Sequence, residues 1–205
     1  MIAVVDYGVG NLFSLLSSLR FIGAEAEVTS SPAVLARADG IILPGVGAFA
    51  DARAKLAASG AERAIRDEVE KGKPFLGICL GMQMLFERSY EYGTHEGLGF
   101  IPGEVVPFSL PAGMKVPHMG WNGLHILRPC PLLAHTSEGE YVYYVHSYHA
   151  TGCAGYTAAV SDYGIPVTGV VARGNIYGTQ FHPEKSGETG LNILRAFKEI
   201  TEGRL

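Results

Sequence analysis

The feature that most constrains the fold is an alternation of short apolar runs with helical stretches through the first half of the chain. The apolar runs predict strands at residues 2–6, 25–29, 40–43 and 74–78. The intervening patterns predict helices at residues 11–21, 32–37, 49–71 with a break at Gly60, and 81–88. Strands that alternate with helices are joined by crossovers, so we expect a largely parallel sheet.

The second half of the chain changes character. Short strands joined by tight turns are predicted at residues 104–108, 141–149, 157–161, 167–173 and 175–181, and a final helix at 187–201. We therefore expect an α/β fold: a three-layer sandwich with an open, mostly parallel sheet and an antiparallel extension. The sequence contains no repeat and no linker, so residues 1–205 are interpreted as a single domain.

Composition excludes several classes of protein. With 47% apolar and 18% charged residues, the chain is typical of a compact soluble protein. The net charge is −4 and no dense cluster of Lys and Arg is present, so neither nucleic acid nor a membrane is expected as a partner. The N-terminus lacks the basic start of a signal peptide, and no apolar run has the length of a membrane span. Three cysteines without clustered spacing favour a reduced, cytoplasmic protein.

The segment around Cys79 carries the strongest chemical signal. A predicted strand runs into Cys79 and a helix starts just after it, with Gly77 and Gly81 on either side. Gly-x-Cys-x-Gly matches the nucleophile elbow, in which a sharp turn holds the nucleophile in a strained conformation. The helix N-terminus favours a thiolate, and the Leu80 N–H is placed to donate to an oxyanion. Gln83, one helical turn further on, lies on the same face as Cys79.

A second interpretation of Cys79 remains open, because free cysteines are among the most buried residues in proteins. A buried structural cysteine at the end of a strand has the same local pattern. Cys130 and Cys153 have no strand-to-helix context, and we interpret both as structural.

A base for the cysteine is predicted at His182. This residue ends a predicted strand, and Glu184 follows two positions later, so in an extended segment both side chains point the same way. Pro183 keeps His182 out of helical geometry. A carboxylate on one ring nitrogen leaves the other nitrogen free to accept the thiol proton. The alternative is a surface His-Pro turn with a glutamate nearby by chance.

The other polar motifs are weaker. His146 and His149 are three apart in a predicted strand, so we expect them on opposite faces and not as a metal pair. No metal and no cofactor are expected, because neither zinc-finger nor metalloprotease spacing occurs. The turn from Asp6 to Asn11 lacks the third glycine of a dinucleotide-binding loop. Gly45 and Gly47 follow the third strand, and their backbone N–H groups are expected beside Cys79 unless the loop is an ordinary glycine-rich turn.

Together these segments resemble class I glutamine amidotransferases. The resemblance rests on Pro44-Gly45-Val46-Gly47, on residues 77–83 and on Gln180-Phe181-His182-Pro183-Glu184, which occur in the family's order. Within the class, the sequence is most similar to the glutaminase subunits of imidazole glycerol phosphate synthases, which act in histidine biosynthesis. The features that point to this group are the N-terminal segment 6–12, Met82, the segment 117–122 and Lys185-Ser186.

The resemblance implies a mechanism and a set of residues. Cys79, His182 and Glu184 would form a catalytic triad that hydrolyses glutamine to glutamate and ammonia, and the backbone of Gly45, Val46 and Leu80 would form the oxyanion hole. The implied substrate residues are Gln83, Tyr144, His146, Ser147 and Tyr148. The implied partner is a (β/α)₈ cyclase that receives the ammonia within a heterodimer, with Asn11, Trp121 and Lys185 near the interface.

Three other functions compete with this one. A class I glutaminase serving another synthase would share the triad, and Met82, Trp121 and Lys185-Ser186 argue against it only by resemblance. A stand-alone hydrolase of γ-glutamyl bonds would work without a partner. A catalytically silent scaffolding subunit is disfavoured by the intact Cys79, His182 and Glu184.

Overall fold

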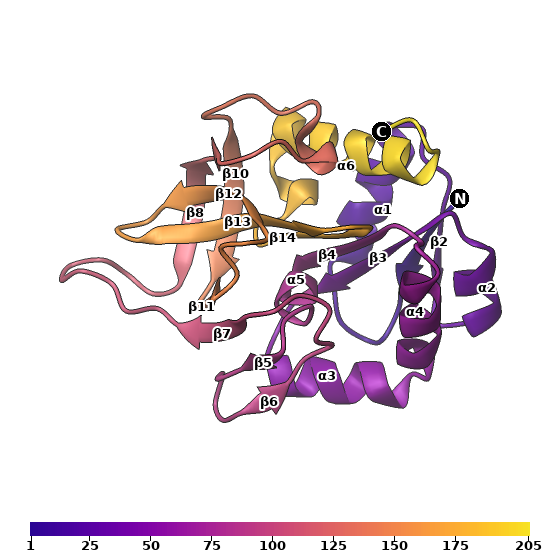
Figure 1. Cartoon of the computed structure of the whole chain (residues 1–205), viewed down its shortest axis with the longest axis horizontal. Coiled ribbons are helices and arrows are strands. Elements are labelled where there is room, and N and C mark those ends of the chain that lie inside the picture. Colours follow the sequence, from indigo (N-terminus) through magenta and orange to yellow (C-terminus); the bar gives the residue numbers. More distant parts are fainter.

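The computed structural model describes all residues, 1–205, and its centre is a single eight-stranded sheet (Figure 1). The strand order is β2-β1-β3-β4-β14-β13-β12-β9. The first five of these are mutually parallel: β2 (Ala26–Thr29), β1 (Ile2–Val5), β3 (Gly40–Gly45), β4 (Phe75–Cys79) and β14 (Ile176–Thr179). The remaining three pair antiparallel: β13 (Pro166–Arg173), β12 (Thr157–Asp162) and β9 (His125–Ile126). The expected α/β sandwich with a mostly parallel sheet and an antiparallel extension is confirmed.

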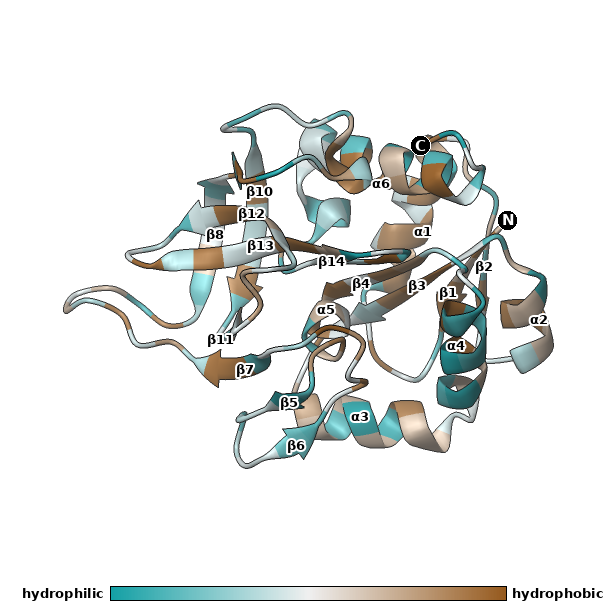
Figure 2. Cartoon of the chain, viewed as in Figure 1, coloured by the Kyte–Doolittle hydropathy of each residue, from teal (hydrophilic) through white to brown (hydrophobic).

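Helices cover both faces of the sheet. On one face lie α1 (Leu12–Phe21) and α6 (Gly187–Thr201), and on the other α2 (Pro32–Arg37), α3 (Phe49–Ala58) and α4 (Ala61–Glu70) (Figure 1). Alternate residues of β1 divide between two apolar clusters, with Ile2 and Val4 facing α1 and α6, and Ala3 and Val5 facing the other side. Because successive side chains of a strand point to opposite faces of the sheet, and helices cover both faces, the central strands are apolar throughout, as Figure 2 shows. None of the helices has the length and apolar character needed to cross a lipid bilayer.

Two smaller sheets lie beside the antiparallel end of the main sheet, next to β12 and β13 (Figure 1). One pairs β8 (His118–Gly123) with β10 (Tyr141–His146), and the other has the order β11-β7-β5-β6. The strands of the second are β11 (Tyr148–Thr151), β7 (Glu104–Pro107), β5 (Arg88–Ser89) and β6 (His95–Glu96). The sequence patterns did not predict β5, β6, β8, β9 or the two 3-10 turns, η1 (Pro131–Leu133) and η2 (Pro183–Lys185).

The helix predicted at residues 81–88 is wrong for its second half, because α5 covers only Leu80–Gln83. The carbonyl groups that would continue the helix accept hydrogen bonds from a later segment instead. The N–H of Leu98 bonds to Met84, and the N–H of Ile101 bonds to Leu85. Tertiary pairing therefore replaces the helical hydrogen bonds after the first turn.

The strand predicted at residues 141–149 is divided at Ser147. Its first part, β10, pairs with β8, while its second part, β11, pairs with β7 in a different sheet. The break also overturns the expected opposite placement of His146 and His149. Both rings contact the ring of Phe108, with centroid distances of 5.2 and 4.7 Å.

Candidate active site

The turn at Cys79 has the strained geometry expected of a nucleophile elbow. Cys79 ends β4 in the middle of the sheet and has φ 54° and ψ −109°, a conformation that non-glycine residues rarely adopt. A Cβ on Gly77 would lie 2.6 Å from the Gly81 carbonyl oxygen, and a Cβ on Gly81 would lie 1.9 Å from that of Leu43. The two glycines are thus required because the turn folds back against its own strand and against β3.

His182 lies beyond the end of β14, the strand next to β4, and contacts Glu184. Its Nδ1 is 2.8 Å from Glu184 Oε1, and both side chains are only 3% exposed. The contact does not arise from an extended segment, as the spacing had suggested. His182 is extended, but Pro183 starts the 3-10 turn η2, and this turn brings the carboxylate back to the ring.

The environment of His182 favours its protonated form. Burial alone would lower the pKa of His182, but the Cys79 sulfur and the Glu184 carboxylate together raise that pKa to about 10. Negative charge on these two neighbours stabilises the imidazolium between them. The arrangement therefore gives His182 a high proton affinity, which suits a general base beside a nucleophile.

The segment that carries His182 is fastened to β10 by hydrogen bonds. The His182 N–H donates to the Tyr143 carbonyl at 3.0 Å, and the Tyr143 N–H donates to the Ser186 hydroxyl oxygen at 3.0 Å. The Ser186 hydroxyl in turn donates to the His182 carbonyl at 2.6 Å. Because Ser186 is also buried, the backbone on both sides of Pro183 is held in place.

Cys79 and His182 open into a single cavity of about 330 Å³. Its wall includes most of the side chains predicted from the sequence, namely Val46, Leu80, Gln83, His146, Ser147, Tyr148 and Lys185. This volume suits a small amino acid, because ligand pockets begin at about 300 Å³.

Of the three residues expected in an oxyanion hole, Val46 and Leu80 line the cavity and Gly45 does not. Gly45 pairs with Cys79 between the strands, and a Cβ on it would lie 2.6 Å from the Gly81 nitrogen. Gly45 therefore permits close packing of β3 against the elbow. The neighbouring Val46 N–H donates no hydrogen bond within the protein, so it is available to a ligand.

Tyr144 is the expected substrate residue that the structure keeps away from the cavity. Its side chain is fully buried, and its hydroxyl lies 2.9 Å from the Ser161 hydroxyl. The remaining members of the predicted set, Gln83, His146, Ser147 and Tyr148, all contribute to the wall. Gln83 uses its Nε2 group to donate to the Tyr148 carbonyl at 3.0 Å and to Gln180 Oε1 at 3.1 Å.

Two residues of the site were missed by the sequence interpretation. Gln180 is buried and its Nε2 lies 3.8 Å from Cys79 Sγ. Its position two residues before His182 in an extended segment was the available signal. Glu91 also lines the cavity, and its carboxylate accepts the Phe49 N–H at the start of α3 at 2.5 Å. No local pattern marked Glu91, because this contact joins residues 42 apart.

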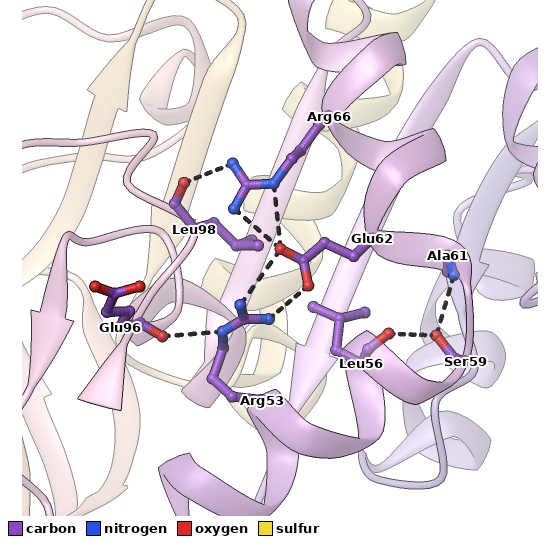
Figure 3. Close-up of polar contacts among 8 residues, drawn as sticks. All are labelled: Arg53, Leu56, Ser59, Ala61, Glu62, Arg66, Glu96 and Leu98. Carbon is purple, nitrogen blue, oxygen red and sulfur yellow. Dashed lines mark hydrogen bonds and ion pairs between the residues drawn. The ribbon is translucent and has the colours of Figure 1, made fainter. Parts of the chain in front are cut away.

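The hairpin β5–β6, with Glu91 in its turn, is anchored to two helices by an ion-pair network (Figure 3). Glu62 of α4 accepts hydrogen bonds from Arg53 of α3 and from Arg66 one turn along α4. The same guanidinium groups donate to backbone carbonyls at the base of the hairpin, Arg53 to Glu96 at 3.0 Å and Arg66 to Leu98 at 2.8 Å. Figure 3 shows both arginines bridging Glu62 to this segment, so the network holds one wall of the cavity.

The residues expected at a partner interface come from three separate segments of the chain. Lys185 is exposed and lines the cavity, and Asn11 precedes α1, which packs on η2. Trp121 on β8 is 52% exposed, and its ring meets that of Tyr143 at 5.8 Å. Together with Met119, which is 59% exposed on the same strand, Trp121 gives this sheet an apolar outer surface.

The other two cysteines lie apart from this chemistry. Cys130 and Cys153 are buried, and neither lines the cavity. Burial raises the pKa of the Cys130 thiol, which makes it a poor nucleophile. No group of three or more His, Cys, Asp or Glu side chains is arranged to hold a metal ion.

Comparisons with known proteins agree with this geometry. Residues 3–200 match the family described as glutamine amidotransferase class-I. The chain is 49% identical over 201 residues to "Imidazole glycerol phosphate synthase subunit HisH" of Caldanaerobacter subterraneus subsp. tengcongensis, with 98% of each chain covered. It is 52% identical over 198 residues to the protein of the same name from Desulfitobacterium hafniense, with 96% of this chain and 93% of the relative covered.

Solved structures share the fold at much lower identity. The structure of PurLQS from Thermotoga maritima aligns with a TM-score of 0.76 and 21% identity, covering 96% of each chain. The glutaminase domain of CTPS from Trypanosoma brucei, solved with bound acivicin, aligns with a TM-score of 0.64 and 18% identity, covering 96% of this chain and 92% of the other.

Proposed function

The chain belongs to the class I glutamine amidotransferase family, and from this premise we propose that it is the glutaminase subunit of an imidazole glycerol phosphate synthase. It hydrolyses glutamine to glutamate and ammonia for histidine biosynthesis. The observation that carries the proposal is identity of about 50%, over nearly the full length, to proteins that bear this name. The strained turn at Cys79 and the buried pair of His182 and Glu184 supply the matching chemistry.

The proposed reaction starts with transfer of the Cys79 thiol proton to His182. The Cys79 sulfur attacks the side-chain amide carbon of glutamine, and the carbonyl electrons move onto oxygen. When this intermediate collapses, the C–N bond breaks and the imidazolium of His182 gives its proton to the departing nitrogen, which leaves as ammonia. His182 then takes a proton from water as that water attacks the thioester, and glutamate leaves as Cys79 is released. Glu184 keeps the ring oriented throughout.

The cavity supplies the remaining roles in this proposal. The free N–H of Val46 and the N–H of Leu80 at the start of α5 stabilise the oxyanion, with Gly45 setting the approach of β3. Gln83, His146, Ser147 and Tyr148 surround the amino-acid part of glutamine. Glu91 adds a carboxylate suited to the substrate's ammonium group.

The proposed partner is a (β/α)₈ cyclase subunit that forms a heterodimer with this chain. Ammonia released into neutral water is mostly protonated and no longer nucleophilic, so a path that excludes water is needed. Asn11, Trp121 and Lys185 mark the surface on which the cyclase docks. The joint reaction gives imidazole glycerol phosphate and an aminoimidazole carboxamide ribotide. The proposal includes a cytoplasmic location and one domain spanning residues 1–205, since strands from both halves share the main sheet.

The test uses the Cys79→Ala chain in complex with the cyclase. We expect no product with glutamine but normal product with added ammonium at raised pH, because the cyclase needs only free ammonia. Product formation from glutamine by the Cys79→Ala complex would contradict the role of Cys79. Full glutaminase activity of the isolated wild-type chain, with no response to the cyclase, would favour the stand-alone hydrolase instead.

A further inference from the structure

A line of four polar contacts runs from the β12 turn to the wall of the cavity. Asn122 Nδ2 lies 2.9 Å from the Asp162 carbonyl oxygen, and Asn122 Oδ1 lies 2.8 Å from His118 Nε2. His118 Nδ1 is then 3.0 Å from His146 Nε2, and His146 Nδ1 is 2.7 Å from the Tyr148 carbonyl oxygen. Both ends of the line are carbonyl oxygens, which can only accept.

This line is one proton short when both rings are neutral. Each of the four contacts needs one hydrogen, the Asn122 amide supplies hydrogens on one side only, and each neutral imidazole supplies one. Three of the contacts can therefore be hydrogen bonds at any moment, and the fourth sets two acceptors against each other. Rotating the amide moves the shortage to Asp162 without removing it.

The surroundings keep the pair neutral. His118 is fully buried and His146 nearly so. Burial lowers the pKa of His118, and that of His146 falls to about 3 because burial outweighs the contact with the Tyr148 carbonyl. No carboxylate contacts either ring to hold an extra proton. The titratable groups that face the pair are Tyr144, His149, Tyr163 and His182, with Glu91 and Lys185 across the cavity.

The Tyr148 carbonyl is the point at which this line meets the catalytic centre. It accepts Gln83 Nε2 at 3.0 Å as well as facing His146. Gln83 also donates to Gln180, whose Nε2 lies 3.8 Å from Cys79 Sγ. Gain or loss of the hydrogen bond from His146 to the Tyr148 carbonyl therefore affects the residues that line the substrate cavity.

We propose that His118 and His146 are positioning residues which, as a neutral pair, carry two hydrogens for three contacts, so that the hydrogen bond to the Tyr148 carbonyl competes with the bonds to Asn122 and between the two rings. In one arrangement the His146 proton is on Nδ1 and bonds to the carbonyl, while His118 satisfies only one of its two contacts. In another, His118 donates to Asn122 and His146 donates to His118, so the carbonyl loses this bond. The role in glutamine binding rests on the proposed function, whereas the proton positions do not.

The proton positions are measurable by nitrogen NMR of the imidazole rings in the full chain. His118→Phe removes the competition while keeping a ring between Tyr144 and Tyr163, which stack on His118 at 4.6 and 3.9 Å. We expect the His146 proton to be shared between both nitrogens in the wild type and to move to Nδ1 in His118→Phe. Asn122→Ala, which removes the acceptor by a different change, should shift the proton the same way. His125→Phe, which removes an exposed imidazole on β9, is the matched control and should change nothing.

The functional consequence is measured as glutamine binding by the Cys79→Ala chain. His118→Phe should tighten binding by about two- to tenfold, the range of one hydrogen bond, and His146→Phe should weaken it by a similar factor. A proton already confined to one nitrogen of His146, and unmoved by His118→Phe, would overturn the proposal. A third proton on the pair at neutral pH, or weaker binding in His118→Phe, would do the same. Failure of every chain to bind glutamine would contradict the proposed function while leaving the NMR result to stand.

Discussion

Gly190→Ala tests whether the position of the segment that carries His182 and Glu184 depends on its close packing against α6. Gly190 lies in the first turns of α6, where a Cβ would sit 1.9 Å from the Pro183 carbonyl oxygen and 2.7 Å from its carbon. Pro183 joins His182 to Glu184. The substitution therefore pushes the helix against the backbone that orients the proposed base.

The size of the effect follows from that distance. Reaching ordinary contact at about 3.4 Å requires a shift of roughly 1.5 Å by either the helix or the turn. The helix resists, because Ile193, Leu194 and Phe197 are fully buried on its inner face. We expect most of the shift in η2, where a displacement of about 1 Å can lower activity about 100-fold. Overpacking should also reduce the free energy of unfolding by about 1–3 kcal/mol.

The assay is glutaminase kcat/KM of the chain with its cyclase, measured alongside urea unfolding. Gly155→Ala is the matched control, because no atom lies within 4 Å of a Cβ at that position and its φ is ordinary. This control should keep both activity and stability. Near-normal kcat/KM in a folded Gly190→Ala chain would refute the claim that activity depends on close packing of the Pro183 backbone against α6.

Four further outcomes are expected. A diazo-ketone analogue of glutamine should label Cys79 and leave the other two cysteines unmodified in mass spectra. His182→Ala should abolish turnover while Glu184→Gln retains some, because Glu184 orients the base; equal loss in both would require a larger role for the carboxylate. Because the pKa of His182 is raised to about 10, its protonation contributes stability that is fully present below pH 6.5 and is lost as pH rises through about 10. Glu184→Gln should therefore lower the free energy of unfolding by about 1.5–3 kcal/mol at neutral pH, measured by urea unfolding, and this loss should shrink above pH 10. Glu62→Gln should lower the free energy of unfolding by about 1 kcal/mol at neutral pH and by little at acid pH. Burial opposes the charge of Glu62, but Arg53 and Arg66 lower its pKa, so the stability that the carboxylate contributes is lost as pH falls through that lowered pKa.

The elbow was predictable because its cause is local and steric. Glycine on both sides of Cys79, between a strand and a helix, is enough to indicate a turn that folds back on itself. The parallel order of the first strands was predictable for a similar reason, since crossover helices leave few topologies. Patterns of this kind depend on residues within about ten positions of one another.

The pairing of His182 with Glu184 was expected for a reason that the structure corrects. Alternation along an extended segment would place both side chains on one face, but the chain turns at Pro183. The contact forms because η2 curls back and because Tyr143 and Ser186 hold both of its ends. Those anchors lie 39 residues before His182 and four after it, so no local pattern revealed the first of them.

The sequence pattern wrongly predicted that Tyr144 lies in the site, and the reason shows what decides whether a strand residue reaches it. Tyr144 and His146 are two apart and face the same side of β10, so alternation alone assigns them together. Only His146 meets the cavity, because the strand ends there and the chain leaves β8 to join β7. That exit is set by two competing sheets rather than by residues 144–148 themselves. The same exit brings His146 against the Tyr148 carbonyl, so the feature that misled the sequence interpretation is also the one that links His118 to the substrate wall.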